Sequence, residues 1–239
     1  MADRLDKYLT QCGLGSRSDV KNLIKKGRII VDGVKASDPG LKVDSTNVVL
    51  FDGEPLNREV FHYYMLNKPQ GVISATEDNL SETVIDILKD ENVKGLFPVG
   101  RLDKDTEGLL LITDDGELSH NLLSPKKHVD KTYFVIGDAK IDEDGKKQIE
   151  AGIDIGEDKL CKPAVLEFVE KCQQGYSYYL TITEGKFHQV KRMFKAAGSN
   201  VVFLKRISMG PLMLDEKLNP GEYRKLTGSE VESLKNSGT

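Results

Sequence analysis

Residues 100–113 constrain the fold most, because a charged half, GRLDKDTE, is followed directly by an apolar half, GLLLIT. A continuous apolar run such as Leu109 to Ile112, bounded by Gly and Asp, is typical of a strand buried within a sheet. The charged half then forms the loop that leads into this strand, where a rigid scaffold can hold reactive side chains. The acids of this half, Asp103, Asp105 and Glu107, are therefore candidate reactive side chains. In an isolated Arg-Leu-Asp triplet, however, the carboxylate more often caps a helix or pairs with Arg101.

Bulk properties limit the classes of function. The chain has 239 residues, which suits one large domain or a medium domain with a small companion. Its net charge of −4 gives no sign of nucleic-acid binding, so any such function requires basic residues clustered on one surface. The three cysteines show no CxxC spacing and predict neither a disulfide framework nor a zinc site.

The N-terminus has no apolar signal core, and no window approaches the roughly 20 apolar residues of a membrane helix. We therefore expect a soluble, cytoplasmic protein that does not enter a membrane, with its thiols reduced.

Residues 1–57 are expected to form a separate domain. Apolar residues at helical spacing predict a helix over residues 5–12, which is ended by the glycines that follow. Ser16 is a candidate N-cap of a second helix, and Asp19 takes the capping-box position three residues later. The Asp32-Gly33 turn then predicts a hairpin over residues 28–35.

Basic residues dominate the polar face of the second helix and its end. They are Arg17, Lys21, Lys25, Lys26 and Arg28, against one acid. Such a face can bind phosphates, or it can simply be a solvated helix surface.

The order helix, helix, hairpin, with G-x-I-x-V-[DN]-G present at residues 27–33, resembles the RNA-binding domain first described in ribosomal protein S-four. The resemblance covers most of residues 3–53. It implies that the helix-and-hairpin surface binds an RNA duplex or junction. The candidate RNA-binding residues are Arg17, Lys21, Lys25 and Arg28.

A short linker around residues 57–59 leads to a second expected domain, residues 60–235, with mixed strands and helices. Strands are predicted at residues 63–66, 109–112, 131–135, 177–183 and 201–207. Helices are predicted at residues 83–89, 116–123, 142–151 and 185–197. Residues 236–239 are expected to fray.

The full motif, GRLD followed by T-x-GLLLxT, resembles the catalytic motif of RNA pseudouridine synthases, in the RsuA-like branch that modifies ribosomal RNA. Further matches are NKPQG at 67–71, EGKFHQVKRM at 184–193 and LNPGEYRKLT at 218–227, so the resemblance spans nearly the whole chain. It implies an α+β protein, in which a small N-terminal ααβ RNA-binding domain is joined to a mixed, largely antiparallel catalytic domain. It also implies an enzyme that isomerises uridine to pseudouridine.

This reaction breaks the glycosidic nitrogen–carbon bond, turns the base and rejoins it through a carbon. No redox change or transfer of an external group occurs, so the chemistry requires no cofactor and no metal. It requires a carboxylate as nucleophile or base, a cation that keeps the carboxylate ionised, and a flat side chain that holds the base outside the RNA stack. The resemblance assigns these roles to Asp103, Lys191 and Tyr133 respectively.

Each assignment has a plainer alternative. A strand tyrosine such as Tyr133 is ordinarily half-buried packing, and residues 185–197 could be a basic surface helix. Many relatives carry Arg where this chain has Lys191, which replaces a bidentate fork with a point charge and favours the small-subunit branch. Arg192 is the second choice as the cation and is expected to contact phosphate.

Two more positions are expected at the site. Arg101, in an extended backbone, points to the same side as Asp103 and is expected to help extrude the target nucleotide. Leu204 matches an apolar position that packs beneath the active site in the family, which differs little from plain core packing. The four histidines are scattered without metal-ligand spacing, so we expect RNA-facing or structural roles for them.

The expected substrate is one uridine, or a few, in ribosomal RNA. We favour 16S rRNA of the small subunit, because Lys191, residues 124–128 and the short tail resemble that branch. The large-subunit 23S rRNA is the near alternative. A non-catalytic RNA-binding ribosome-assembly factor is the alternative from another class, and the complete set of three catalytic candidates argues against it. Nothing in the chain demands more than a monomer.

Overall fold

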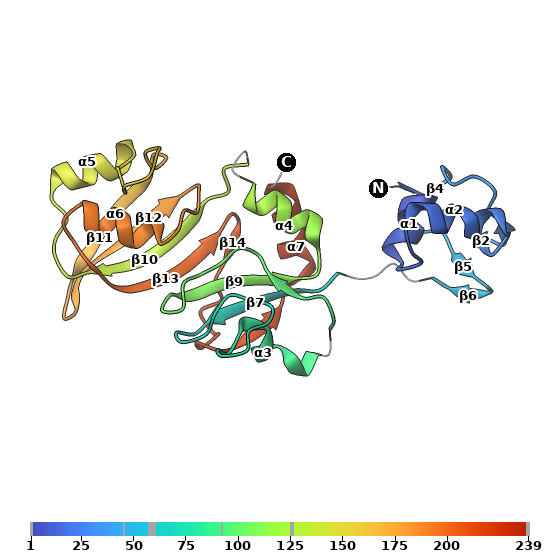
Figure 1. Cartoon of the computed structure of the whole chain (residues 1–239), viewed down its shortest axis with the longest axis horizontal. Coiled ribbons are helices and arrows are strands. Elements are labelled where there is room, and N and C mark those ends of the chain that lie inside the picture. The colour runs from blue at the N-terminus through green and yellow to red at the C-terminus, as the bar shows by residue number, and fades with distance from the viewer. Residues whose placement is uncertain (1, 45, 57–60, 92, 125–126, 238–239) are drawn as a thin grey trace. The chain divides into compact units, whose positions relative to one another are not determined.

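The computed structural model describes residues 2–44, 46–56, 61–91, 93–124 and 127–237. The chain divides into two compact units, Met1–Phe61 and His62–Thr239 (Figure 1). The linker expected at residues 57–59, two residues of the segment 124–128 and the final two residues of the chain lie outside the described residues.

The N-terminal unit packs two helices on small antiparallel sheets. Its helices are α1 (Leu5–Gln11) and α2 (Arg17–Lys25). Its strands are β1 (Asp3–Arg4), β2 (Ile29–Val31), β3 (Val34–Lys35), β4 (Lys42–Val43), β5 (Val49–Phe51) and β6 (Glu54–Pro55), with the sheet order β3-β2-β5-β6 and a separate β1–β4 pair. The expected helices and hairpin are present, and apolar residues of α1 and α2 share one core with β2.

The N-terminus of α2 shows why the local prediction held. The Ser16 hydroxyl accepts a hydrogen bond from the Asp19 backbone N–H at 3.3 Å, and the Asp19 carboxylate accepts one from the Ser16 backbone N–H at 2.9 Å. The predicted capping box is therefore confirmed, and it satisfies backbone donors that would otherwise lack partners.

The C-terminal unit is built on one large sheet. Its strands are β7 (Tyr63–Lys68), β8 (Phe97–Pro98), β9 (Glu107–Thr113), β10 (Lys131–Gly137), β11 (Val165–Cys172), β12 (Gly175–Ile182), β13 (Val201–Met209), β14 (Leu212–Met213) and β15 (Tyr223–Lys225). Its helices are α3 (Val84–Ile87), α4 (Gly116–Leu123), α5 (Glu143–Ala151), α6 (Gln189–Ala196) and α7 (Gly228–Ser237), with a 3-10 helix at Lys89–Glu91.

The strand order is β11-β12-β10-β13-β9-β7-β15, with β14 on β13 and β8 on β9. Among the described residues, β13 and β9 pair in parallel and the other pairs of this sheet are antiparallel. The expected α+β class with a largely antiparallel sheet is confirmed.

Strand β9 lies inside this sheet and is buried on both faces. Leu110 and Ile112 belong to the core that also contains residues of α6 and of β10 to β12. Leu109 and Leu111 belong to a second core, on which α4 and α7 pack. In Figure 1, α5 and α6 accompany β10 to β12, and α4 and α7 lie near β9. A strand covered on both faces needs no polar alternation, which explains the uninterrupted apolar run in the sequence.

Two predicted features differ from the structure, and some of its elements were not predicted. The helix expected at 185–197 begins at Gln189, because His188 adopts a left-handed conformation with φ of 48° and residues 184–188 form a loop. The expected fraying was wrong for residues 236 and 237, since α7 continues through Ser237, whose hydroxyl donates to the Leu234 carbonyl at 2.8 Å. Strands β11 and β15 and helix α7 were not predicted. In the described part of the chain, no helix is both long enough and apolar enough to cross a bilayer.

Candidate active site

The loop at residues 100–106 leads into β9 and carries Asp103. The Asp103 carbonyl accepts a hydrogen bond from the Thr106 backbone N–H at 3.0 Å, which closes a tight turn. Ser74 fixes the residue before it, since its hydroxyl donates to the Leu102 carbonyl at 2.9 Å and accepts from the Leu102 N–H at 3.1 Å. These hydrogen bonds hold the backbone on both sides of the Asp103 side chain.

Lys68, at the end of β7, forms hydrogen bonds with the backbone of the same loop. Its fully buried ammonium donates hydrogen bonds to the carbonyls of Thr106 at 3.0 Å and Pro69 at 2.9 Å, with Lys104 at 3.4 Å. Burial lowers the pKa of Lys68 to about 8, although nearby carboxylates, among them Asp103, partly oppose the shift. The sequence contained the NKP motif, but we assigned no role to this lysine from it.

Gly108 brings β9 and β13 together beside the loop. It pairs with Arg206 in the parallel register and has φ of 102°. A Cβ at this position would overlap the Arg206 carbonyl oxygen, so a side chain does not fit. On its other side, Arg206 of β13 pairs with Tyr133 of β10. The close approach of β13 to β9 therefore places Tyr133 near the loop that carries Asp103.

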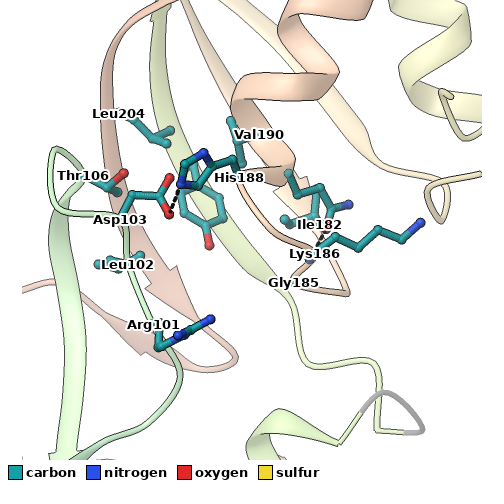
Figure 2. Close-up of a pocket in the computed structure, with 12 residues that line it drawn as sticks. Arg101, Leu102, Asp103, Thr106, Ile182, Gly185, Lys186, His188, Val190 and Leu204 are labelled. Carbon is teal, nitrogen blue, oxygen red and sulfur yellow. Dashed lines mark hydrogen bonds and ion pairs between the residues drawn. The ribbon is translucent and has the colours of Figure 1, made fainter. Parts of the chain in front are cut away.

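Asp103 is one of the residues that line a pocket of about 80 Å³ (Figure 2). Tyr133 and Leu204 are buried residues of its wall, and the Asp103 side chain is 27% exposed. The lining residues are Arg101, Leu102, Asp103, Thr106, Tyr133, Ile182, Gly185, Lys186, His188, Gln189, Val190 and Leu204. Four sequence candidates, Arg101, Asp103, Tyr133 and Leu204, therefore meet in one pocket although they come from distant parts of the sequence.

Two basic side chains flank the Asp103 carboxylate. Lys191 Nζ lies 3.4 Å from Asp103 Oδ2 and 2.5 Å from Oδ1 of Asp105. His188 Nε2 lies 3.5 Å from Asp103 Oδ1, a contact that is drawn as a dashed line in Figure 2. The hydrogen bond from Lys191 holds the pKa of Asp105 below its usual range. Lys191 is thus shared between two carboxylates, and neither the shorter contact to Asp105 nor the contact of His188 was predicted.

A wider cleft, of about 730 Å³, adjoins the pocket and shares part of its lining, including Arg101, Asp103 and Lys186. Lys131 also lines it, and burial lowers the pKa of that lysine to about 8, with a further contribution from the positive charge of Arg206. The pocket beside Asp103 therefore opens onto this wider cleft and is not sealed.

Arg192 turns away from Asp103. Its guanidinium donates to the Ile155 carbonyl at 2.5 Å from Nη2, to the Phe187 carbonyl at 3.1 Å and to Glu157 at 2.6 Å. These bonds tie α6 to two loops. A contact of Arg192 with phosphate stays a prediction.

The basic candidates of the N-terminal unit lie on its surface. Arg17, Lys21, Lys25 and Arg28 are exposed. Lys21 and Lys25 line a groove of about 520 Å³ together with Lys35. Arg28 donates to Asp52 at 2.8 Å from Nε and lies over the Phe51 ring. Lys21 and Lys25 thus form a basic groove, whereas Arg28 already has an acidic partner.

Comparisons with known proteins agree on both units. The RNA pseudouridylate synthase family model matches residues 62–196, and the S4 domain model matches residues 3–49. An uncharacterised RNA pseudouridine synthase of Bacillus subtilis is 50% identical and covers 97% of this chain and 98% of its own. The ribosomal small subunit pseudouridine synthase A of Escherichia coli is 42% identical, covering 97% and 99%.

The chain is also similar to solved structures of pseudouridine synthases and of proteins with a related fold. The crystal structure of a pseudouridylate synthase is 39% identical, with a TM-score of 0.69, and the match covers 97% of this chain and 99% of that chain. A chain in the archaeal box H/ACA sRNP Nop10–Cbf5 complex is 19% identical, with a TM-score of 0.51, over 67% of this chain and 51% of that chain. The second likeness concerns the fold alone.

Proposed function

Since the chain belongs to the RNA pseudouridine synthase family, we propose that it isomerises one uridine, or a few, in ribosomal RNA, and specifically in 16S rRNA. The small-subunit enzyme of E. coli, at 42% identity over nearly the full length of both chains, supports the choice of RNA. The protein acts as a monomer in the cytoplasm in this proposal.

The observation that carries the proposal is the setting of Asp103. Its carboxylate is partly exposed in a pocket, beside the buried Tyr133 and within 3.4 Å of the Lys191 ammonium. An RNA base cannot reach such a pocket while stacked, so the uridine must first leave the helix. The Tyr133 ring then offers a flat surface for the base.

The chemistry is an isomerisation, in which atoms and charge balance within the nucleotide. The bond from N1 to the sugar C1′ breaks, the base turns, and C5 bonds to C1′. C5 loses a proton and N1 gains one. Asp103 serves as nucleophile or base in these steps, and the Lys191 ammonium places a positive charge 3.4 Å from its carboxylate. No cofactor enters the scheme.

In this proposal, both units make further contacts with the RNA. Arg101 lines the pocket and the wider cleft, and it makes no ion pair within the described residues. It is therefore placed to grip a phosphate or fill the gap left by the extruded base. In the RNA-binding domain, proposed as residues 1–57, the cations of α2 contact phosphates; the catalytic domain is proposed as residues 60–235.

Mapping of pseudouridine in 16S and 23S rRNA tests the proposal. The purified protein and Asp103→Asn are incubated with each unmodified rRNA and with small-subunit assembly intermediates. We expect new pseudouridine in 16S rRNA with the natural protein, none with the variant, and equal RNA affinity for both. An Asp103-dependent site in 23S rRNA would overturn the choice of RNA. Binding without modification in any substrate would favour an assembly factor.

A further inference from the structure

Phe187 is an exposed aromatic residue beside the reaction pocket. Its side chain belongs to the lining of the wide cleft, yet it is 69% exposed. Its ring stacks on the His188 imidazole, with centroids 3.9 Å apart and planes inclined by 18°. His188 contacts Asp103, and Phe187 stacks on His188. The two rings therefore form a continuous row that begins at the proposed catalytic carboxylate.

The loop that carries this pair is held from several sides. The Phe187 carbonyl accepts a hydrogen bond from Arg192 at 3.1 Å. Gln189 accepts one from the Lys186 N–H and donates one to Glu184, each at 2.8 Å. The backbone that carries the exposed ring is therefore held in place, so binding would require little ordering of the loop.

The surroundings of Phe187 suit a nucleic-acid strand. Arg101 and Lys104 line the same cleft and are exposed. Lys131 and Lys186 also line it, but their ammonium groups already donate hydrogen bonds to backbone carbonyls. Glu184, an acid of this lining, already accepts hydrogen bonds from Gln189 and from the Lys162 N–H. Cations along a groove with an exposed aromatic ring are the usual arrangement for single-stranded RNA, because phosphates pair with the cations and a base stacks on the ring.

We propose that the Phe187–His188 stack binds the nucleobase next to the target uridine, a subsite that rests on the function proposed above. Extruding the uridine takes a stacking partner from its neighbour in the RNA. The open face of Phe187 replaces that partner, while His188 covers the other face. The subsite accepts any base with a flat face and favours purines, whose larger rings stack more strongly.

The test uses an RNA fragment that contains the mapped target uridine, with Phe187→Leu, Phe187→Tyr and the control Phe168→Leu. Phe168 is 49% exposed on the edge strand β11 and is not part of the cleft lining. We expect Phe187→Leu to raise KM roughly ten-fold with little change in kcat, because stacking on an aromatic side chain contributes about that factor. Phe187→Tyr and Phe168→Leu should match the natural protein.

A second readout reports stacking directly. The fluorescent base 2-aminopurine, placed beside the target uridine, is quenched when it stacks. We expect quenching on binding to the natural protein and to Phe187→Tyr, and its loss with Phe187→Leu. Equal KM and equal quenching for Phe187→Leu and Phe187→Tyr would overturn the subsite alone. Failure of the natural protein to modify any RNA would overturn the proposed function and the subsite with it.

Discussion

The buried ammonium of Lys68 donates a hydrogen bond to the backbone carbonyl of Thr106 at 3.0 Å. Lys68 ends β7 and Thr106 immediately precedes β9, its antiparallel neighbour. A charge in the core therefore supports the backbone of the loop that carries Asp103. The loop is positioned by a group that does not line the reaction pocket.

Replacing this anchor should affect activity more than stability. Lys68→Met keeps most of the volume, removes a buried charge and deletes the bonds to the Thr106, Pro69 and Lys104 carbonyls. We expect kcat to fall on the order of 100-fold, because a misplacement of about 1 Å has that effect. Thermal unfolding followed by circular dichroism should show a folded variant. Unchanged kcat would show that the loop holds its position without Lys68.

Lys191 contacts two carboxylates, and substitution can separate them. Lys191→Met removes the cation beside Asp103 and should lower kcat by about 100-fold or more, as loss of one electrostatic contact at a reacting centre does. Asp105→Asn should change kcat by about three-fold at most, because that carboxylate is 67% exposed and exposed ion pairs contribute little. Single-turnover rates measure both. If Asp105→Asn abolished turnover, the catalytic role would move to Asp105.

The structural features that could be predicted are those that depend on residues close together in the sequence. Ser16 and Asp19 cap a helix three residues apart, and the motif around Asp103 is continuous in the chain. Lys68 and Thr106 are 38 residues apart in sequence, so no local pattern reports their contact. The late start of α6 likewise depends on the left-handed His188, which helical periodicity does not reveal.

Gly108 lies between these two cases. The motif contained this glycine, but its reason appears only where β13 approaches β9 and the Arg206 carbonyl occupies the space of a Cβ. Helix α7 was not predicted because its residues are largely exposed and show no apolar stripe. Among the residues of α7 that the structure describes, Leu234 alone is buried. Tertiary contact, more than periodicity, stabilises such a helix.

The basic groove of the N-terminal unit should control the salt dependence of RNA binding. Lys21→Gln with Lys25→Gln removes two exposed cations that line this groove, so folding should be unaffected. We expect weaker binding and a slope of log K against log salt that is less steep by roughly 1.4 to 1.8. Titrations between low and moderate salt measure the slope. The matched control is Lys146→Gln with Lys147→Gln on α5, for which an equal loss would indicate a general charge effect.

Acid should weaken the attachment of α7 through Glu230. The Glu230 carboxylate accepts two hydrogen bonds from Arg224 of β15, at 2.8 and 2.9 Å, and these bonds are the main cause that lowers its pKa to about 2. Because the folded pKa is lower than the unfolded value of 4.5, the stabilisation is complete above pH 4.5 and is lost as the pH falls towards 2.

Glu230→Gln keeps the shape of the side chain and removes this titration. We expect the variant to be less stable at pH 7, with a free energy of unfolding lower by on the order of 2 kcal/mol, a figure reduced for the side chain's partial exposure. The difference should shrink between pH 4.5 and pH 2, because the natural carboxylate then becomes neutral as well. Urea unfolding followed by circular dichroism at several pH values measures it. A constant difference across this range would mean that Glu230 stabilises α7 by its shape and hydrogen bonds, without its charge.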